Sequence, residues 1–245
     1  MSSALINILI GLVTSVLSGT AVLLWRQATG TRVLRRKAAF FGLRPGGACL
    51  IVMNNHWQLP GSTSHNDVEV MLQAATLAQE AGSQVSLIAA DRQPDQQESC
   101  VEFCIGGPVS NPRTAAHLAA YLPGVKSRPM SDKRSSGAIV VAGRQFIYKR
   151  GQQEYALIAR FTPRHSSDQV FLIYGQRSID NLAAITFLKR EYRLLSKAHG
   201  IGTDFCLVIR VTSPDTYGYL AAELEADVTA AAFRAVPRAA PAPAP

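Results

Sequence analysis

Residues 48–89 read ACLIVMNNHWQLPGSTSHNDVEVMLQAATLAQEAGSQVSLIA, and this stretch decides the class of fold. Its first six residues are a continuous apolar run, which is typical of a strand buried on both faces. From about residue 65 to residue 81, apolar residues recur at helical spacing, and residues 85–89 form a second buried strand pattern. A strand, a helix and a strand in this order predict two parallel strands joined by a helix that covers one face of the sheet.

The same alternation continues toward the C-terminus. Further apolar runs predict buried strands over residues 101–105, 170–174 and 205–211. Helices are predicted over about 114–121 and 181–198. The β-branched and aromatic runs 144–148 and 154–161 are separated by a turn, which predicts an antiparallel hairpin. We therefore expect an α/β fold, a Rossmann-like three-layer sandwich with a mainly parallel sheet plus this hairpin.

The N-terminal segment has the features of a transmembrane helix. No charged residue occurs between Ala4 and Trp25, and about twenty apolar residues in a helix span the hydrocarbon core of a bilayer. Basic residues follow at once, from Arg26 to Lys37, so the positive-inside rule places the following chain in the cytoplasm. The alternative is a secretory signal peptide, which carries its basic residues before a shorter apolar run.

The sequence thus predicts one transmembrane helix before the α/β domain. The expected parts are the helix over 1–25, a basic juxtamembrane linker over 26–47, the cytoplasmic α/β domain over 48–234 and a disordered Pro/Ala tail over 235–245. The expected location is the cell membrane, crossed once by residues 4–25, with the N-terminus outside. Small residues in the span, such as Gly11 and Gly19, also suggest a homodimer through this helix.

The net charge of +8 does not indicate a nucleic-acid-binding protein. Six of the 25 basic residues precede the first acidic residue, Asp67, which leaves 19 basic against 17 acidic residues in the rest of the chain. The basic excess therefore lies beside the apolar segment, where anionic lipid headgroups attract it. Nucleic acid is not an expected partner.

The cysteines predict neither disulfides nor a metal centre. They all lie in or beside apolar runs, at Cys49, Cys100, Cys104 and Cys206, which is typical of buried thiols in a reducing compartment. No C-x-x-C pair occurs, and His56 and His65 match no zinc spacing. No metal and no cofactor can be assigned from these residues.

Ligands of open parallel sheets bind beyond the carboxyl ends of the strands. Three loops follow predicted strands here, at 54–67, 106–114 and 175–181, and we expect them to open on one side and share a pocket. The candidate ligand-binding residues in these loops are Asp67, Gly106, Gly107, Ser110, Asn111, Arg113, Thr114, Gly175, Arg177 and Ser178.

Each candidate has a structural alternative. Gly106 and Gly107 allow a ligand to approach the backbone, but they equally make a turn before a helix that Asn111 caps. Arg113 at the start of that helix would favour an anion. Asp67 suits a ribose hydroxyl, yet it also has the spacing of a helix cap with Ser64. No catalytic residue can be assigned.

The run 105–114 and the strand, glycine and helix of 170–190 loosely resemble Rossmann-like nucleotide-recognition domains of the SLOG and TIR-like groups, found in membrane-anchored bacterial signalling and defence proteins. The resemblance covers the layout of about 48–212, and the glycine motif of SLOG proteins is absent. It implies a nucleotide as ligand.

Three functions remain open on this evidence. The leading hypothesis is a membrane-tethered module that senses a nucleotide-like or other anionic small molecule. The second is a membrane-anchored scaffold that binds another protein and has no small ligand. The third is an enzyme acting on a nucleotide or sugar phosphate, with Asp67, Glu69 or Glu102 as acid/base groups.

Overall fold

The computed structural model describes residues 14, 18–20, 25, 30–56, 59, 61–92, 99–128, 137–164 and 166–234. The chain divides into two compact units, residues 1–37 and 38–245. In the first unit, the described residues are helical. The second unit contains both sheets and all the strands described below.

The predicted transmembrane helix is contradicted. No helix in the described part of the chain is long and apolar enough to cross a membrane. The described helical stretch 30–40 follows the predicted span, and its four basic residues keep it from being apolar enough to cross a membrane itself. Most of residues 4–25, on which the prediction rests, lies outside the described residues, as does the predicted tail 235–245. The membrane location stays a prediction.

The larger sheet confirms the predicted α/β class. Its seven strands lie in the order β10-β9-β7-β8-β3-β1-β2. Their bounds are β1 (Ala48–Met53), β2 (Gln84–Ala89), β3 (Cys100–Ile105), β7 (Gln153–Phe161), β8 (Val170–Gly175), β9 (Phe205–Thr212) and β10 (Ala222–Asp227). The strands β2, β1, β3 and β8 run parallel, and β7, β9 and β10 extend the sheet by antiparallel pairing.

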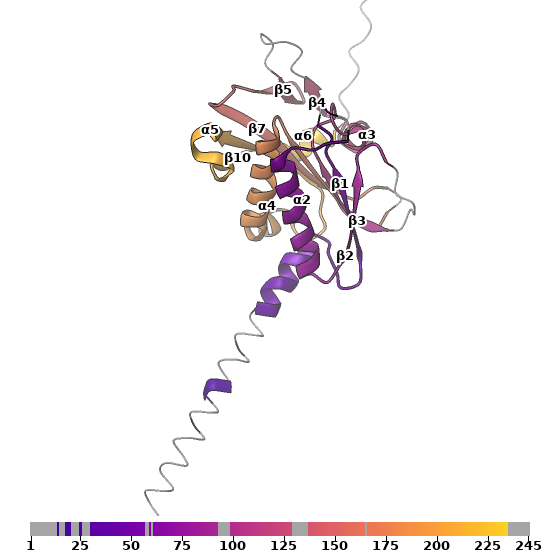
Figure 1. Ribbon diagram of the computed structural model, residues 1–245, viewed down its shortest axis with the longest axis vertical. Coiled ribbons are helices and arrows are strands. Elements are labelled where there is room, and N and C mark those ends of the chain that lie inside the picture. Colours follow the sequence, from indigo (N-terminus) through magenta and orange to yellow (C-terminus); the bar gives the residue numbers. More distant parts are fainter. Residues whose placement is uncertain are drawn as a thin grey trace, which may run out of the picture. The chain divides into compact units, whose positions relative to one another are not determined.

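Helices and a small sheet cover the two faces. The helices are α2 (His65–Glu80), α3 (Pro112–Tyr121), α4 (Ser178–His199), α5 (Pro214–Tyr217), η1 (Gly218–Leu220) and α6 (Thr229–Ala232). The small antiparallel sheet consists of β4 (Val125–Arg128), β5 (Ala138–Val141) and β6 (Arg144–Ile147). The helices α2 and α4 lie side by side on one face (Figure 1). The helices α3 and α6 and the small sheet pack on the other.

The predicted hairpin of 144–148 and 154–161 is wrong. The strand β6 belongs to the small sheet and pairs with β5, whereas β7 pairs with β8 and β9 in the large sheet. One isolated bridge, between Lys149 and Gln153, joins the two segments. The burial pattern gives the reason. Eight of the nine residues of β7 are buried, so this strand needs cover on both faces, while β6 has one buried residue in four.

The guanidinium group of Arg160 on β7 holds three segments together in the core. It is completely buried. It donates hydrogen bonds to the carbonyl oxygens of Phe40 (3.1 Å), Gly200 (3.0 Å) and Thr203 (2.9 Å). It also lies over the rings of Phe40 and Phe205, 4.9 and 4.6 Å from their centroids. Burial lowers the pKa of Arg160 to about 10, so the group stays charged at neutral pH.

Replacing Arg160 with Met should lower the free energy of unfolding by about 3 kcal/mol, because the buried carbonyl group of Phe40 and the part-buried carbonyl groups of Gly200 and Thr203 lose their donor. The measurement is urea unfolding followed by circular dichroism. Arg164→Met, at an exposed loop position, is the matched control and should change stability by less than about 0.5 kcal/mol. Equal effects of the two substitutions would show that Arg160 does not tie these segments.

Candidate functional site

The carboxyl ends of β1 and β3 form the topological switch point of the sheet. After β1 the chain continues into α2 on one face, and after β3 it continues into α3 on the opposite face. In open α/β sheets, ligands bind where neighbouring strands diverge in this way. We call the ends of these strands, with segments 54–56, 61–64 and 106–111, the switch point. The backbone nitrogen of Asn55 donates to the carbonyl oxygen of Ser110 (3.4 Å), and the backbone nitrogen of His56 donates to the carbonyl oxygen of Ser62 (2.8 Å), so the three segments meet.

The buried carboxylate of Asp67 joins the first of the predicted loops to the third. It is 2% exposed. Its Oδ2 accepts hydrogen bonds from Nδ2 of Asn54 (3.0 Å) and Oγ of Ser64 (2.9 Å), and its Oδ1 accepts one from Nδ2 of Asn181 (2.7 Å). The predicted cap is also present, since Ser64 Oγ accepts from the backbone nitrogen of Asp67. Asp67 is therefore both a capping residue and the link between two loops.

Two side-chain amides, of Asn181 and Asn66, connect the third loop to its neighbours. The Oδ1 of Asn181 accepts from the backbone nitrogen of Gly175 (2.6 Å), at the end of β8. Asn66 Nδ2 donates to Ser178 Oγ (3.2 Å), which joins the starts of α2 and α4. Three of the predicted residues, Asp67, Gly175 and Ser178, thus lie in one connected region.

The glycines of the second loop are explained by packing within the protein. Gly106 has φ +98°, and a Cβ there would lie 2.1 Å from Oδ1 of Asn54. A Cβ on Gly107 would lie 2.8 Å from the ring of Tyr174. The side chains of Asn54 and Tyr174 therefore occupy the space beside these glycines. Both glycines are thus explained by packing, without a ligand.

The arginine of the second loop does not face an open site. The Nε and Nη2 of Arg113 donate to the two carboxylate oxygens of Glu102 on β3, at 2.7 and 2.6 Å. The start of α3 is also closed, because Asn111 Oδ1 accepts from the backbone nitrogens of Arg113 and Thr114. Pro112, the residue directly after the cap, has no N–H group. An anion would find no free donor among these groups.

The arginine of the third loop is paired as well. Arg177 Nε donates to Glu154 Oε2 (2.6 Å), and its Nη2 donates to Asp215 Oδ1 (3.0 Å). Glu154, at the start of β7, is completely buried beside Asp180. Burial first, and the charge of Glu154 second, raise the pKa of Asp180 well above its ordinary value. A proton on Asp180 lets it donate to Glu154.

Unpaired oxygen atoms gather in the segment between β1 and α2. Asn54 Oδ1, Asn55 Oδ1 and Thr63 Oγ1 are buried and have no hydrogen-bond partner within the described structure. The amide of Asn54 cannot be turned to relieve this, because its Nδ2 donates to Asp67. Buried polar atoms without partners are rare in folded proteins, and each one calls for a water or a ligand.

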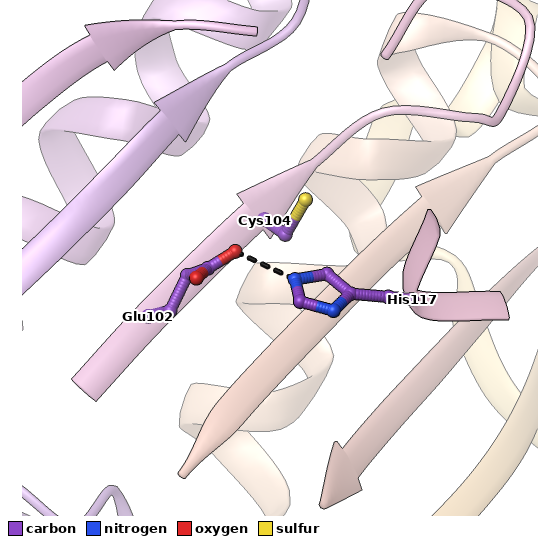
Figure 2. A group of neighbouring side chains, drawn as sticks. All are labelled: Glu102, Cys104 and His117. Carbon is purple, nitrogen blue, oxygen red and sulfur yellow. Dashed lines mark hydrogen bonds and ion pairs between the residues drawn. The ribbon is translucent and has the colours of Figure 1, made fainter. Parts of the chain in front are cut away.

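One group of side chains has the residue types of a metal site. Figure 2 shows Glu102 and Cys104 on β3 facing His117 on α3. The possible ligand atoms of these three side chains all lie within 4.8 Å of one another, and no other such group occurs within the described residues. His117 Nε2 is 2.8 Å from Glu102 Oε1.

The hydrogen bonds of this group satisfy its atoms without a metal. Glu102 already bonds Arg113 and His117. The hydroxyl of Thr114 donates its one proton to the carbonyl of Gly106 (2.8 Å), so in its 3.3 Å contact with Cys104 the thiol must be the donor. Burial raises the pKa of Cys104 to about 12. The hydrogen bonds among Glu102, Arg113, His117, Cys104 and Thr114 therefore account for this cluster within the protein itself.

The groove beside α3 lies apart from the candidate residues. It has a volume of about 530 Å³ and is open and shallow, with a mainly apolar lining from α3, β4 and the turn at Pro108 and Val109. None of the candidate ligand-binding residues lines it. Glu69, named as an acid/base group, lies on the surface and pairs with His65 (3.1 Å).

Arg113→Ala should lower the free energy of unfolding by about 3 kcal/mol, because it leaves the buried carboxylate of Glu102 with one partner instead of two. Urea unfolding measures this. The matched control is Arg144→Ala, which breaks the exposed pair with Glu225 and should cost less than about 1 kcal/mol. A small effect of Arg113→Ala would mean that this arginine is available to a ligand.

Asp180→Asn should stabilise the protein increasingly as pH rises. Because the native pKa of Asp180 is raised, the contribution of its protonated form to stability is fully present below the unfolded pKa of about 4. This contribution is lost as pH rises through the native pKa. Asparagine resembles the protonated acid, since it can accept from the backbone nitrogen of Arg177 and donate to Glu154. The measurement is the melting temperature of both proteins between about pH 4 and pH 9.

Asp215→Asn, on the exposed partner of the same arginine, is the control and should show no such growth with pH. If the melting temperatures of Asp180→Asn and the wild type stay parallel throughout, the proton on Asp180 is disproved.

Comparison with known proteins adds no family to this description. The sequence matches no protein-family model, and no curated protein is similar to it. The resemblance to SLOG and TIR-like domains therefore stays an expectation.

Proposed function

We propose that this chain is a binding module for a nucleotide-like small molecule, which it holds at the switch point through hydroxyl or amino groups of the ligand. The observation that carries the proposal is the set of three buried oxygens without donors, on Asn54, Asn55 and Thr63. A ribose or a base supplies such donors. A ligand at the ends of β1 and β3 also agrees with the rule for open α/β sheets.

The pairing of charges favours this form of recognition over recognition of a phosphate group. Arg113 and Arg177 were the cations expected to meet an anion, and each bonds a buried glutamate instead. Releasing either arginine would leave a buried carboxylate without its partner, at a cost of several kcal/mol. The neutral donors of a ligand meet no such obstacle.

The carboxylates named for an enzyme are engaged in similar ways. Asp67 accepts three side-chain hydrogen bonds, and Glu102 accepts three from Arg113 and His117. A general base needs a free lone pair directed at its substrate. Binding therefore has more support than catalysis.

A thermal-shift screen of the chain against nucleosides and their mono- and triphosphates tests the proposal, because a ligand that binds only the native state raises the melting temperature. Nucleosides should raise it as much as the corresponding nucleotides. A screen without any shift at millimolar ligand would contradict the proposal, and so would a shift that requires the phosphate groups.

Thr63→Val gives a sharper test. Valine has nearly the shape of threonine but lacks the unpaired hydroxyl, so the ligand-free protein should gain about 1 kcal/mol of stability. The same change should weaken binding of the nucleoside found in the screen by about tenfold, since it removes one hydrogen bond. Calorimetric titration and urea unfolding measure the two effects.

The matched control is Thr76→Val on α2, whose hydroxyl is exposed and donates to the carbonyl of Leu72. It should leave affinity unchanged. Unchanged affinity in Thr63→Val as well would place the ligand away from this segment.

A further inference from the structure

The two edges of the large sheet differ in how they are protected. Within the described residues, β2 pairs only with β1, and its sequence QVSLIA has no charge, no proline and no shift of register. The opposite edge strand, β10, carries Glu223, Glu225 and Asp227 and has a register shift between Leu224 and Ala226. Charges and bulges are the usual means of keeping an edge from pairing with another strand. By these criteria β2 is an unprotected edge.

The helix α2 presents an exposed apolar residue toward this open edge. The other side of α2 faces α4, because Asn66 contacts Ser178 and Gln73 contacts Thr186. At about 100° per residue, Val68 lies on the side of the helix opposite α4. It is 38% exposed.

The sheet adds a second exposed apolar residue. Leu87 on β2 is 55% exposed. Side chains alternate along a strand, so Leu87 lies on the face of Val85, which packs against the core under α2. Val68 and Leu87 thus accompany the unpaired edge on the α2 face, and we call them, together with β2, the edge strip.

We propose that the edge strip binds a second copy of this chain, with β2 pairing antiparallel to β2 of the partner. A two-fold axis normal to the sheet joins the two sheets into one and keeps α2 of both copies on the same face. Backbone hydrogen bonds and the contact between the two α2 helices then form at the same time. This dimer differs from the one that the sequence predicts through residues 4–25.

Charge supports a second copy as the occupant. Self-pairing places each residue of a strand opposite residues of the same strand, so a charged strand would meet like charges. The six residues of β2 carry none, whereas β10 would bring three acids against three acids. Of the two edges, β2 alone can pair with itself without repulsion.

Sedimentation equilibrium of the full-length chain tests this interface. The wild type should be a dimer at micromolar concentration. Leu87→Lys and Val68→Lys each place two like charges near the axis, and each should raise the dimer dissociation constant on the order of 100-fold. Leu224→Lys, at an exposed position on β10, is the matched control and should leave the constant unchanged.

Circular dichroism melting checks that each variant still folds. Because all three positions are exposed, we expect the variants to melt like the wild type. A monomeric wild type at about 100 μM, well above the dissociation constants of stable dimers, would overturn the proposal. So would an undiminished dimer in both Leu87→Lys and Val68→Lys, because association would then use another surface. Pairing of β2 with a peptide of a different protein would appear as a monomer and would count against the proposal too.

Discussion

The carboxylate of Asp67 accepts hydrogen bonds from two nearby residues, Asn54 and Ser64, and from Asn181, which is 114 residues away in the sequence. Asn54 follows β1, Ser64 precedes α2, and Asn181 lies in the first turn of α4. A hydrogen bond to a charged group contributes about 1.5–3 kcal/mol, and an unpaired buried charge costs more than that. The end of β1, the start of α2 and the start of α4 are therefore constrained together, and the same carboxylate holds the side chain of Asn54, whose Oδ1 is unpaired.

A second regularity concerns the arginines. Arg113 and Arg177 each lie at the start of a helix that follows a strand. Each bonds a buried glutamate on a strand, Arg113 with Glu102 and Arg177 with Glu154. The charges of both arginines are thereby neutralised by glutamates of the same chain. This supports the proposed recognition of a ligand through neutral hydrogen bonds. It also explains why glutamates can occupy otherwise apolar strands.

The sequence predicts what depends on neighbouring residues. The buried strand at Ala48–Met53, the cap of α2 by Ser64 and the start of α3 at Asn111 and Pro112 all follow from local patterns, and the structure confirms them. The membrane helix is the exception, because its apolar pattern is local and yet no described helix could span a bilayer.

What escapes prediction depends on distant contacts. The partner of Arg113 is set by the packing of α3 on β3, although a glutamate inside the apolar run 101–105 was a signal that a cation must lie nearby. Nothing local shows that β7 leaves its neighbour β6 for another sheet. Asn181, 114 residues from Asp67 along the chain, looks like any polar residue of a helix start.

The most direct test of this account is a double-mutant cycle on Asp67 and Asn181, with alanine at either or both positions and the free energy of unfolding measured in urea. If the carboxylate ties the start of α4 to the end of β1, the two substitutions should be coupled by about 1.5–3 kcal/mol. A coupling below about 0.3 kcal/mol would show that the segments are held independently, and the switch point as described here would lose its basis.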